Sequence, residues 1–431
     1  MLLHIEKLVY GGDGLGRLPA DEAGHRKAIF VPFVLDGESI EASVIEENRG
    51  YDRAKVEMIL EPAPDRVEPP CPYFQVCGGC HYQHSSYGHQ LEVKAAILRE
   101  NLRRIAKIDL ETELVIHPSA PWNYRNRTRL KVQSAPEFAL GYYRFNSHDL
   151  LPVEKCPISS PLINRAIVDL WQAGRTNKIA HQVEEIELFA DAEDQHLLIE
   201  IHCAPSVSAE TGQQIGDAIC GAVVQCTGAV VFRAQKRGTD LELIASTGAG
   251  ELIYKTAGDQ FRVTAGSFFQ GNRFLLDELV NAVTVEHSGK LALDLYCGVG
   301  LFSLELSKSF AQVTAVESSP TAHSDLLYNA KPNITAVHAT ADRFLNQGSR
   351  KVRPDLVVVD PPRGGLGEVV VRGLGRLGAR QVTYVSCDPA TLSRDLAGLL
   401  DAGYRVQRAH VVDLFPQTFH IESVFELVRA G

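Results

Sequence analysis

The segment Leu291-Ala-Leu-Asp-Leu-Tyr-Cys-Gly-Val-Gly300 sets the architecture of the C-terminal part of this chain. An apolar run leads into a glycine turn, and a helix-like apolar segment, 301–310, follows the turn directly. Further strand-like segments with turns or helices between them are VTAVE (313–317), ITAVHA (334–339), DLVVVDPPRGG (355–365) and QVTYVSCDPA (381–390). Alternating β and α segments predict a doubly wound, largely parallel sheet that binds its ligands at the carboxyl ends of its strands.

Upstream of residue 266 the sequence pattern changes twice. Residues 1–61 contain short β segments broken by glycine turns, which predicts a small β-barrel. The proline-rich segment 61–70 cannot continue a strand ladder and indicates a linker. Between 62 and 265, a helical stretch at 89–107 and several alternating stretches predict an α+β domain. We therefore expect a multidomain α/β protein whose domains span 1–61, 62–265 and 266–431.

Composition and charge limit the possible classes of function. The chain is 45% hydrophobic and 22% charged, as in an ordinary globular protein. No stretch approaches the ~18 to 20 apolar residues of a membrane span, and the N-terminus lacks the apolar core of a signal peptide. We expect a cytoplasmic protein with no membrane partner. The formal net charge of -10 argues against indiscriminate nucleic-acid binding, so any RNA must be held by local basic patches.

Two stretches concentrate basic residues. They are Arg99, Arg103, Arg104 and Lys107 in a helix-like stretch, and Arg125, Arg127, Arg129 and Lys131 in the run WNYRNRTRLK. In the second stretch the basic residues alternate, so in a strand they would share one face, beside two aromatic residues that could stack on bases. The alternative is a solvated strand face with no partner.

The glycine turn at 298–300 suits a nucleoside-containing ligand. Glu317 ends the next predicted strand, where a carboxylate can accept hydrogen bonds from ribose hydroxyls, although the turn alone could be structural. No full pyrophosphate-binding or triphosphate-binding glycine motif is present, so S-adenosylmethionine, which has no phosphate, fits better. Asp360 follows another strand and adds a carboxylate at the same edge.

Cys387 ends the strand 381–386 and therefore lies at the predicted ligand-binding edge. A thiolate there suits methylation at C5 of uracil, because addition to C6 makes C5 nucleophilic. A base must then remove the C5 proton. Glu422, in the apolar segment 413–427, is the proposed base, with His420 as the competing one. Alternatively, Glu422 faces solvent.

Four cysteines form a pattern typical of a metal site. Cys71, Cys77 and Cys80 are closely spaced, and Cys156, followed by proline, supplies a fourth thiolate from a distant segment. Such a set can bind zinc or a 4Fe-4S cluster, and the uneven spacing favours the cluster. The remaining cysteines, Cys203, Cys220, Cys226 and Cys297, are interpreted as small buried residues.

Together these motifs make the sequence resemble bacterial RNA uracil-C5 methyltransferases, in particular the 23S ribosomal RNA branch with an N-terminal TRAM domain. The shared motifs are KLVYGGDGLGR, CPYFQVCGGC with Cys156, SFFQGN (267–272), DLYCGVG, DPPRGGL, YVSCDPATLSRDL and FPQTFHIE. The resemblance implies a TRAM-like, OB-like barrel over 1–61 that binds RNA, a central domain carrying a 4Fe-4S cluster, and a class I, Rossmann-like methyltransferase domain.

The resemblance also implies roles for individual residues. Cys387 would be the nucleophile and Glu422 the base, and the four cysteines would hold the cluster. The implied S-adenosylmethionine contacts are Gln270, Tyr296, Glu317, Thr340 and Asp360. The sequence departs from the family at Leu301 and Asp388, where relatives often have Asn.

The expected partner is RNA, most simply 23S ribosomal RNA, with no DNA. Transfer RNA is the alternative substrate within the same chemistry. A cytosine methyltransferase would also use thiolate addition at C6, but a carboxylate placed as base favours uracil. A non-catalytic iron-sulfur protein that binds RNA is the remaining alternative.

Overall fold

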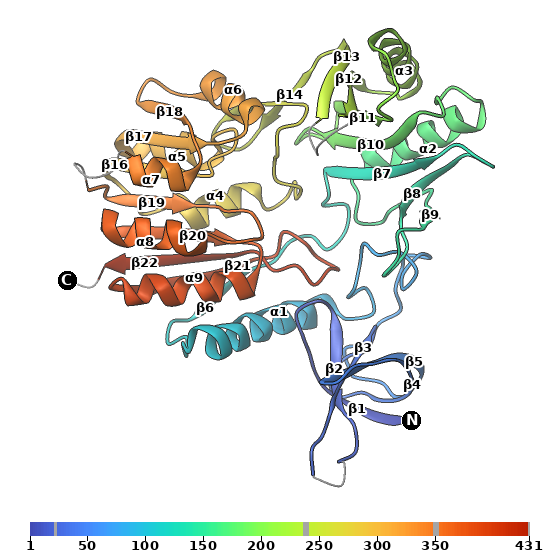
Figure 1. The fold of residues 1–431 in the computed structure, drawn as a ribbon, viewed down its shortest axis with the longest axis vertical. Helices are drawn as coiled ribbons and strands as arrows, with labels where there is room; N and C mark the ends of the chain where they lie inside the picture. Colours follow the sequence, from blue (N-terminus) through green and yellow to red (C-terminus); the bar gives the residue numbers. More distant parts are fainter. Residues whose placement is uncertain (21–23, 236–240, 348–352, 430–431) are drawn as a thin grey trace.

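The computed structural model describes residues 1–20, 24–235, 241–347 and 353–429. Three larger β structures follow one another along the chain, as the colour order in Figure 1 shows: a barrel, a central sheet and a C-terminal sheet flanked by helices. In the described residues, no helix is both long enough and apolar enough to cross a membrane.

The N-terminal unit is a closed five-stranded barrel, which confirms the barrel prediction. Around the barrel the strands run in the order β1, β2, β3, β5, β4. Their bounds are β1 (Leu2–Leu8), β2 (Asp13–Arg17), β3 (Ala28–Pro32), β4 (Ser39–Glu47) and β5 (Tyr51–Glu61). Alternate residues of β1 and β4 point inward, so that Leu3, Ile5 and Ile40 form its small core.

The central unit is a seven-stranded mixed sheet in the order β13, β12, β11, β10, β7, β8, β9. Its strands are β7 (Arg127–Gln133), β8 (Ala139–Tyr143), β9 (Leu150–Pro152), β10 (Val183–Ala190), β11 (Leu197–Cys203), β12 (Cys226–Ala234) and β13 (Leu241–Gly248). Helices α2 (Pro161–Arg175) and α3 (Ala209–Ala222) share an apolar core with this sheet. The helices therefore cover one face.

A two-stranded hairpin connects the central sheet to the last unit. It consists of β14 (Glu251–Lys255) and β15 (Gln260–Thr264). Its residues Tyr254 and Phe261 pack in the same core as Phe189 of β10 and Leu279 of the C-terminal unit. This shared core fixes the central sheet against the C-terminal one.

The C-terminal unit is an eight-stranded sheet in the order β18, β17, β16, β19, β20, β22, β21, β6. Its strands from the C-terminal part are β16 (Gly289–Leu295), β17 (Phe310–Glu317), β18 (Ile334–His338), β19 (Leu356–Val359), β20 (Gln381–Ser386), β21 (Tyr404–Val412) and β22 (Ser423–Arg429). Strands β16 to β20 are parallel, and β22 runs antiparallel to both β20 and β21. The predicted doubly wound sheet is confirmed.

Helices pack on both faces of this sheet (Figure 1). They are α4 (Leu276–Thr284), α5 (Leu301–Ser309), α6 (Pro320–Asn329), α7 (Ala341–Gln347), α8 (Gly367–Leu377) and α9 (Pro389–Asp401). Ala292 packs with α4 to α6 on one face, whereas its neighbours Leu293 and Leu295 pack with α8 and α9 on the other. Both faces are thus buried, which explains the unbroken apolar runs of these strands.

One segment from before residue 266 joins this sheet, which the sequence pattern did not predict. Helix α1 (Tyr87–Asn101) continues into the π-helical turn η1 (Leu102–Ala106) and packs beside α9. Strand β6 (Leu114–His117) then pairs in parallel with β21 at the sheet edge. Helix α1 thereby contacts the loop that links β21 to β22.

Candidate active site and cysteine site

Strand pairing brings Cys387 and Glu422 together. Ser386, the last residue of β20, pairs with Ser423, the first residue of the antiparallel β22. Cys387 directly follows β20 and Glu422 directly precedes β22, so the two are opposite each other one step beyond the ladder. The register therefore places a thiol against a carboxyl group at the carboxyl edge of the sheet.

The thiol of Cys387 lies in a desolvated and negatively charged setting. Burial raises its pKa to about 12, and the carboxylates of Glu422 and Asp360 add to this shift. The guanidinium of Arg363 acts in the opposite direction. Near pH 7 the thiol is therefore protonated, and generating the thiolate requires a group that accepts its proton.

Glu422 and Asp360 form a coupled pair of carboxyl groups. Burial raises the pKa of Glu422 well above its usual range, and the Asp360 carboxylate raises it further. The pKa of Asp360 is raised to about 7, mainly by burial and then by Asp294. Among the described residues, no lysine or arginine forms an ion pair with either group. Glu422 does not face solvent, since it is buried, and a carboxyl group with a raised pKa suits general acid-base catalysis.

His420, the competing candidate, lies at the same site but is held by different contacts. Its Nε2 is 3.4 Å from a guanidinium nitrogen of Arg363, and its ring packs against Phe415 and Phe419. Burial lowers the pKa of His420 to about 3, and Arg363 lowers it further. His420 is therefore neutral near pH 7 and is a weaker base than the Glu422 carboxylate.

The glycine turn after β16 is bound to the residue that ends β17. The Gly298 amide donates to Oε2 of Glu317 over 2.9 Å, and the Ser318 and Ser319 amides donate to its Oε1. Tyr296 and Gly300 both have positive φ, 63° and 98°. These contacts bring the expected cofactor residues Tyr296 and Glu317 to one edge of the sheet.

The other expected cofactor residues lie on three different elements. Asp360 follows β19 next to this edge, and Gln270 is buried in the loop before α4. Thr340 is exposed at the start of α7, where its carbonyl accepts from the Phe344 amide.

Asp388 caps α9 by accepting from the Ala390 and Thr391 amides. This is a role that Asp fills as well as the Asn seen in relatives.

The sequence patterns missed a buried carboxyl group and a partly buried phenol at this edge, Asp294 and Tyr10. Asp294 is fully buried at the end of β16, where burial raises its pKa to about 7 and the Ser303 hydroxyl donates to it over 2.5 Å. Tyr10, in the barrel, donates from its hydroxyl to the Cys387 carbonyl over 3.3 Å and packs edge-on against Phe419. Tyr10 belongs to a conspicuous glycine-rich motif, but no local pattern indicated that this motif reaches the nucleophile.

Three of the four basic residues predicted to share a face in the run 122–131 lie on β7 and are paired with glutamates, whereas Arg125 precedes β7 and lines the cavity that contains the cysteines. Arg127 and Arg129 bind the Glu187 carboxylate of the neighbouring β10, and Lys131 binds Glu185. Arg127 also reaches Glu200 on β11. This favours the structural alternative over phosphate binding.

The four candidate ligand cysteines converge on one cavity of about 470 Å³, lined also by Arg125 and Tyr142. All four are free thiols. Burial raises the pKa of Cys77 to about 11 and raises that of Cys80 still more, and the Cys156 charge adds to both shifts. Thiolates this close together need a cationic group among them, so the residues fit a metal or metal cluster.

The sulfur spacing separates the two metal alternatives. A single metal ion needs at least three ligand atoms close together. Among the described residues, three such atoms lie within 4.8 Å of one another in Glu187, Glu200 and His202. No three of the cysteine sulfurs are this close. Zinc-sulfur bonds of about 2.3 Å would hold four thiolates about 3.8 Å apart. The wider cysteine arrangement suits a multi-iron cluster better than a single zinc ion.

A family model described as tRNA (Uracil-5-)-methyltransferase matches residues 86–430. An uncharacterized RNA methyltransferase of Aquifex aeolicus is 34% identical, over 98% of this chain and 97% of that protein. A 23S rRNA (uracil(1939)-C(5))-methyltransferase of Alkalilimnicola ehrlichii is 31% identical, over 92% of this chain and 91% of that protein.

A solved structure has a similar fold along nearly the whole chain. It is the tRNA (uracil-54, C5)-methyltransferase of Pyrococcus abyssi in complex with S-adenosyl-L-homocysteine. The TM-score is 0.77 at 24% identity, with 99% of this chain and all of that chain covered. At this identity the likeness shows the shared fold.

Proposed function

The chain belongs to the tRNA (uracil-5-)-methyltransferase family and is an S-adenosylmethionine-dependent RNA (uracil-C5)-methyltransferase, and on this premise we propose that Cys387 and Glu422 perform the reaction on 23S ribosomal RNA. The observation that carries the proposal is the pairing of β20 with β22, which sets the thiol opposite the carboxyl group. Both groups are titratable, Glu422 is buried and Cys387 is partly buried, and the register sets them opposite each other, as covalent catalysis followed by elimination requires.

The reaction begins when the Cys387 thiolate adds to C6 of the target uracil. The thiol proton passes to the Asp360 carboxylate, whose charge acts on the thiol, so that Glu422 is still free to act as a base; the proton returns to the thiolate after elimination. Electron density then accumulates at C5, which takes the methyl group supplied by S-adenosylmethionine and releases S-adenosylhomocysteine. The Glu422 carboxylate removes the remaining C5 proton, the C5–C6 double bond re-forms, and the thiolate leaves.

Five residues around the glycine turn form the proposed methyl-donor site. Glu317 would accept hydrogen bonds from the ribose hydroxyls while its carboxylate also holds the turn through Gly298. Gln270, Tyr296, Thr340 and Asp360 complete the site at the ends of neighbouring elements. Since these residues come from separate loops, the fold rather than any one motif aligns the donor methyl group with Cys387.

We further propose that Cys71, Cys77, Cys80 and Cys156 hold a 4Fe-4S cluster. These four residues would supply all the protein ligands of such a group, and the group would supply structural cross-linking. It would join the segment around Cys80 to the start of α2, close to Arg125. The barrel of residues 1–61 is proposed to bind RNA, which is supported by the approach of Tyr10 to Cys387. A folded RNA must extrude its target base to reach this site.

Ribosomal RNA is the preferred substrate because the relative acting on 23S rRNA is 31% identical over 92% of this chain. Transfer RNA is the second candidate, since the matching family model is described by that substrate. The test is methyl transfer from labelled S-adenosylmethionine to unmodified 23S ribosomal RNA and to transfer RNA, followed by nucleoside analysis. We expect labelled 5-methyluridine in ribosomal RNA. Label confined to transfer RNA would overturn the substrate, and label in neither would overturn the enzymatic proposal.

A further inference from the structure

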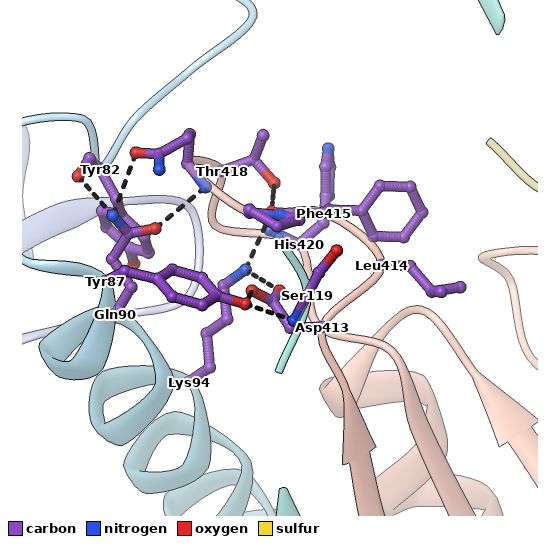
Figure 2. A network of polar contacts seen from close by, with 12 residues as sticks. Tyr82, Tyr87, Gln90, Lys94, Ser119, Asp413, Leu414, Phe415, Thr418 and His420 are labelled. Atoms are coloured by element: carbon purple, nitrogen blue, oxygen red, sulfur yellow. Dashed lines mark hydrogen bonds and ion pairs between the residues drawn. The ribbon is translucent and has the colours of Figure 1, made fainter. Parts of the chain in front are cut away.

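The loop of residues 413–418 links β21 to the segment that carries His420 and Glu422, and it is anchored by a buried ion pair. Lys94 of α1 donates to Oδ1 of Asp413 over 2.6 Å and to the Phe415 carbonyl over 2.9 Å. Lys94 is 0% exposed and Asp413 is 1% exposed. Figure 2 shows Lys94 extending from the helix toward the start of the loop.

A second partner on the same helix strengthens this anchor. The Tyr87 hydroxyl donates to Oδ2 of Asp413 over 2.9 Å and accepts from the Ser119 amide over 2.8 Å. Both oxygens of the buried carboxylate are therefore bonded, and the lysine charge is matched. Such a pair is costly to break from one side only, because the remaining charge stays buried without a partner.

Gln90, one turn before Lys94, holds the other end of the loop. Its Oε1 accepts from the Gln417 amide over 2.9 Å, and its Nε2 donates to the Gln417 side chain over 3.0 Å. Gln417 has a φ of 69°, a conformation that non-glycine residues adopt only when their surroundings hold them. The reciprocal amide pair supplies this constraint.

The loop also contacts the cysteine site and the proposed donor site. The backbone amides of His81 and Tyr82, directly after Cys80, both donate to the Gln417 carbonyl, over 2.8 and 3.0 Å. Asn272, two residues after Gln270, donates to the Leu414 carbonyl over 3.1 Å. The loop is thus held at once by α1, by the cysteine segment and by the loop before α4.

We infer that Lys94, Asp413 and Gln90 are positioning residues for the methyl transfer reaction: they hold the 413–418 loop so that Glu422 stays opposite Cys387 after the covalent adduct has formed. This inference rests on the proposed roles of Cys387 and Glu422. The described side-chain hydrogen bonds of these three residues go to α1, the loop and the cysteine segment and not to the thiol, so they act through the loop. The structural link to Cys80 means that ordering of the cysteine segment also orders the catalytic carboxylate.

Addition of the thiolate and removal of the C5 proton should respond differently to changes in the loop. Cys387 is fixed by β20 and by the N-terminal end of α9, neither of which depends on the loop. Glu422 is held on its C-terminal side by β22 and by the Val412 amide, which donates to its carbonyl over 2.9 Å, but on its N-terminal side it is held by the loop. Loosening the loop should therefore slow removal of the C5 proton more than addition of the thiolate, and the covalent adduct should accumulate.

The test uses the double variant Lys94→Met, Asp413→Asn, which removes both charges, conserves side-chain volume and leaves an acceptor for Tyr87. We expect kcat to fall on the order of 100-fold, because small misplacements of catalytic groups cost about this much. The KM for S-adenosylmethionine should stay within about twofold. Denaturing gels of enzyme mixed with methyl donor and unmodified RNA should show more covalent adduct than the wild type.

The matched control is Glu426→Gln, which alters a buried carboxylate of β22 paired with Arg408 at 3.7 Å, away from the 413–418 loop. It should change thermal stability without accumulating adduct. Wild-type kcat in the double variant, or a loss of activity without added adduct, would overturn the inference. If the double variant does not fold, Tyr87→Phe provides the test, with a smaller shift in the same direction expected.

The wild-type protein separates this inference from the proposed function. RNA containing 5-fluorouridine cannot lose a proton from C5, so it should trap wild-type enzyme through Cys387. Failure to trap would overturn the proposed covalent mechanism. The positioning role alone would be overturned if the wild type is trapped by this RNA but the double variant and the Glu426→Gln control accumulate equal amounts of covalent adduct on unmodified RNA.

Discussion

The carboxyl edge of the C-terminal sheet and the β7–β10 face of the central sheet both contain several glutamates or aspartates that are shielded from solvent. The pKa values of these carboxyl groups are shifted in opposite directions in the two regions. At the edge, Asp360 and Glu422 lack a cationic partner among the described residues, and burial raises both pKa values. On the β7–β10 face, burial alone would raise the pKa of Glu187, yet Arg127 and Arg129 lower it below its usual value.

The difference distinguishes a reactive site from a structural one. A buried carboxyl group that has guanidinium partners has its charge compensated, and removing one partner would be costly. A buried carboxyl group without such a partner destabilises the folded protein and is typical of a site for chemistry or ligand binding. By this criterion the acids around Cys387 are functional, and the basic run on β7 is part of the scaffold.

The largest expected effect is that of Cys387→Ala. Removing the nucleophile should reduce turnover by roughly four orders of magnitude or more, since the other thiol at this edge, Cys297, is buried and its pKa is raised well above the usual value by burial. Binding of S-adenosylmethionine, measured by calorimetry, should remain within about twofold of wild type because the donor residues lie on other loops. Retained turnover would contradict the covalent mechanism and remove the basis for calling this edge reactive.

Glu422→Gln should have the next largest effect. We expect kcat to fall by about 10² to 10⁴, with the enzyme accumulating as a covalent adduct with methylated RNA that denaturing gels can detect. The change should not destabilise the protein at pH 8. With its pKa raised on folding, Glu422 keeps its proton longer in the native state than in the unfolded state. Its contribution to stability is therefore lost as the pH rises above the unfolded value.

The same variant gives a check on the comparison itself. A lower melting temperature for Glu422→Gln than for the wild type at pH 8 would show that the carboxylate has a stabilising partner, as on the β7–β10 face. Lost activity without any adduct would assign the base to another group, and His420→Gln would then be the variant to examine.

The parts of this site that the sequence predicted are those with a local signature. The strand and glycine turn at 291–300 and the cysteine spacing at 71–80 are encoded by neighbouring residues. The alternation in the run 122–131 predicted a shared face for four cations, of which Arg127, Arg129 and Lys131 lie on β7 and Arg125 does not. The neutralisation of the three on β7 depends on Glu185 and Glu187, whose own alternation is visible in the sequence but whose pairing with β7 is not.

Other parts required the three-dimensional structure because they depend on strand register or on distant pairing. Cys387 and Glu422 are opposed only because Ser386 pairs with Ser423. Lys94 and Asp413 are 319 residues apart in the sequence. Strand β6 has four residues, too few for periodicity to indicate which sheet it joins.

The rate at which the Cys387 thiol is alkylated should depend on pH and on Glu422, with smaller changes than those expected for turnover. Because burial and the carboxylates raise its pKa to about 12, the rate of alkylation by iodoacetamide should rise about tenfold per pH unit from 7 to 9 without a plateau. Glu422→Gln removes one negative charge, which lowers the thiol pKa and should speed alkylation at pH 8 by roughly tenfold. Mass spectrometry of the peptide containing Cys387 measures both rates. A plateau below pH 8 would show a cationic partner for the thiolate.

The smallest effect on activity is expected for Glu187→Gln on the β7–β10 face. The variant leaves Arg129, which is 49% exposed at its side chain, to be solvated, while the less exposed Arg127 keeps its contact with Glu200. We expect a loss of about 1 to 3 kcal/mol in the free energy of unfolding, because a buried charged hydrogen bond is removed. Turnover and the salt dependence of RNA binding should stay within about twofold, since these cations do not contact phosphate. A steeper salt dependence would instead show that freeing Arg129 creates a phosphate contact, and that the paired glutamates normally suppress RNA binding on this face.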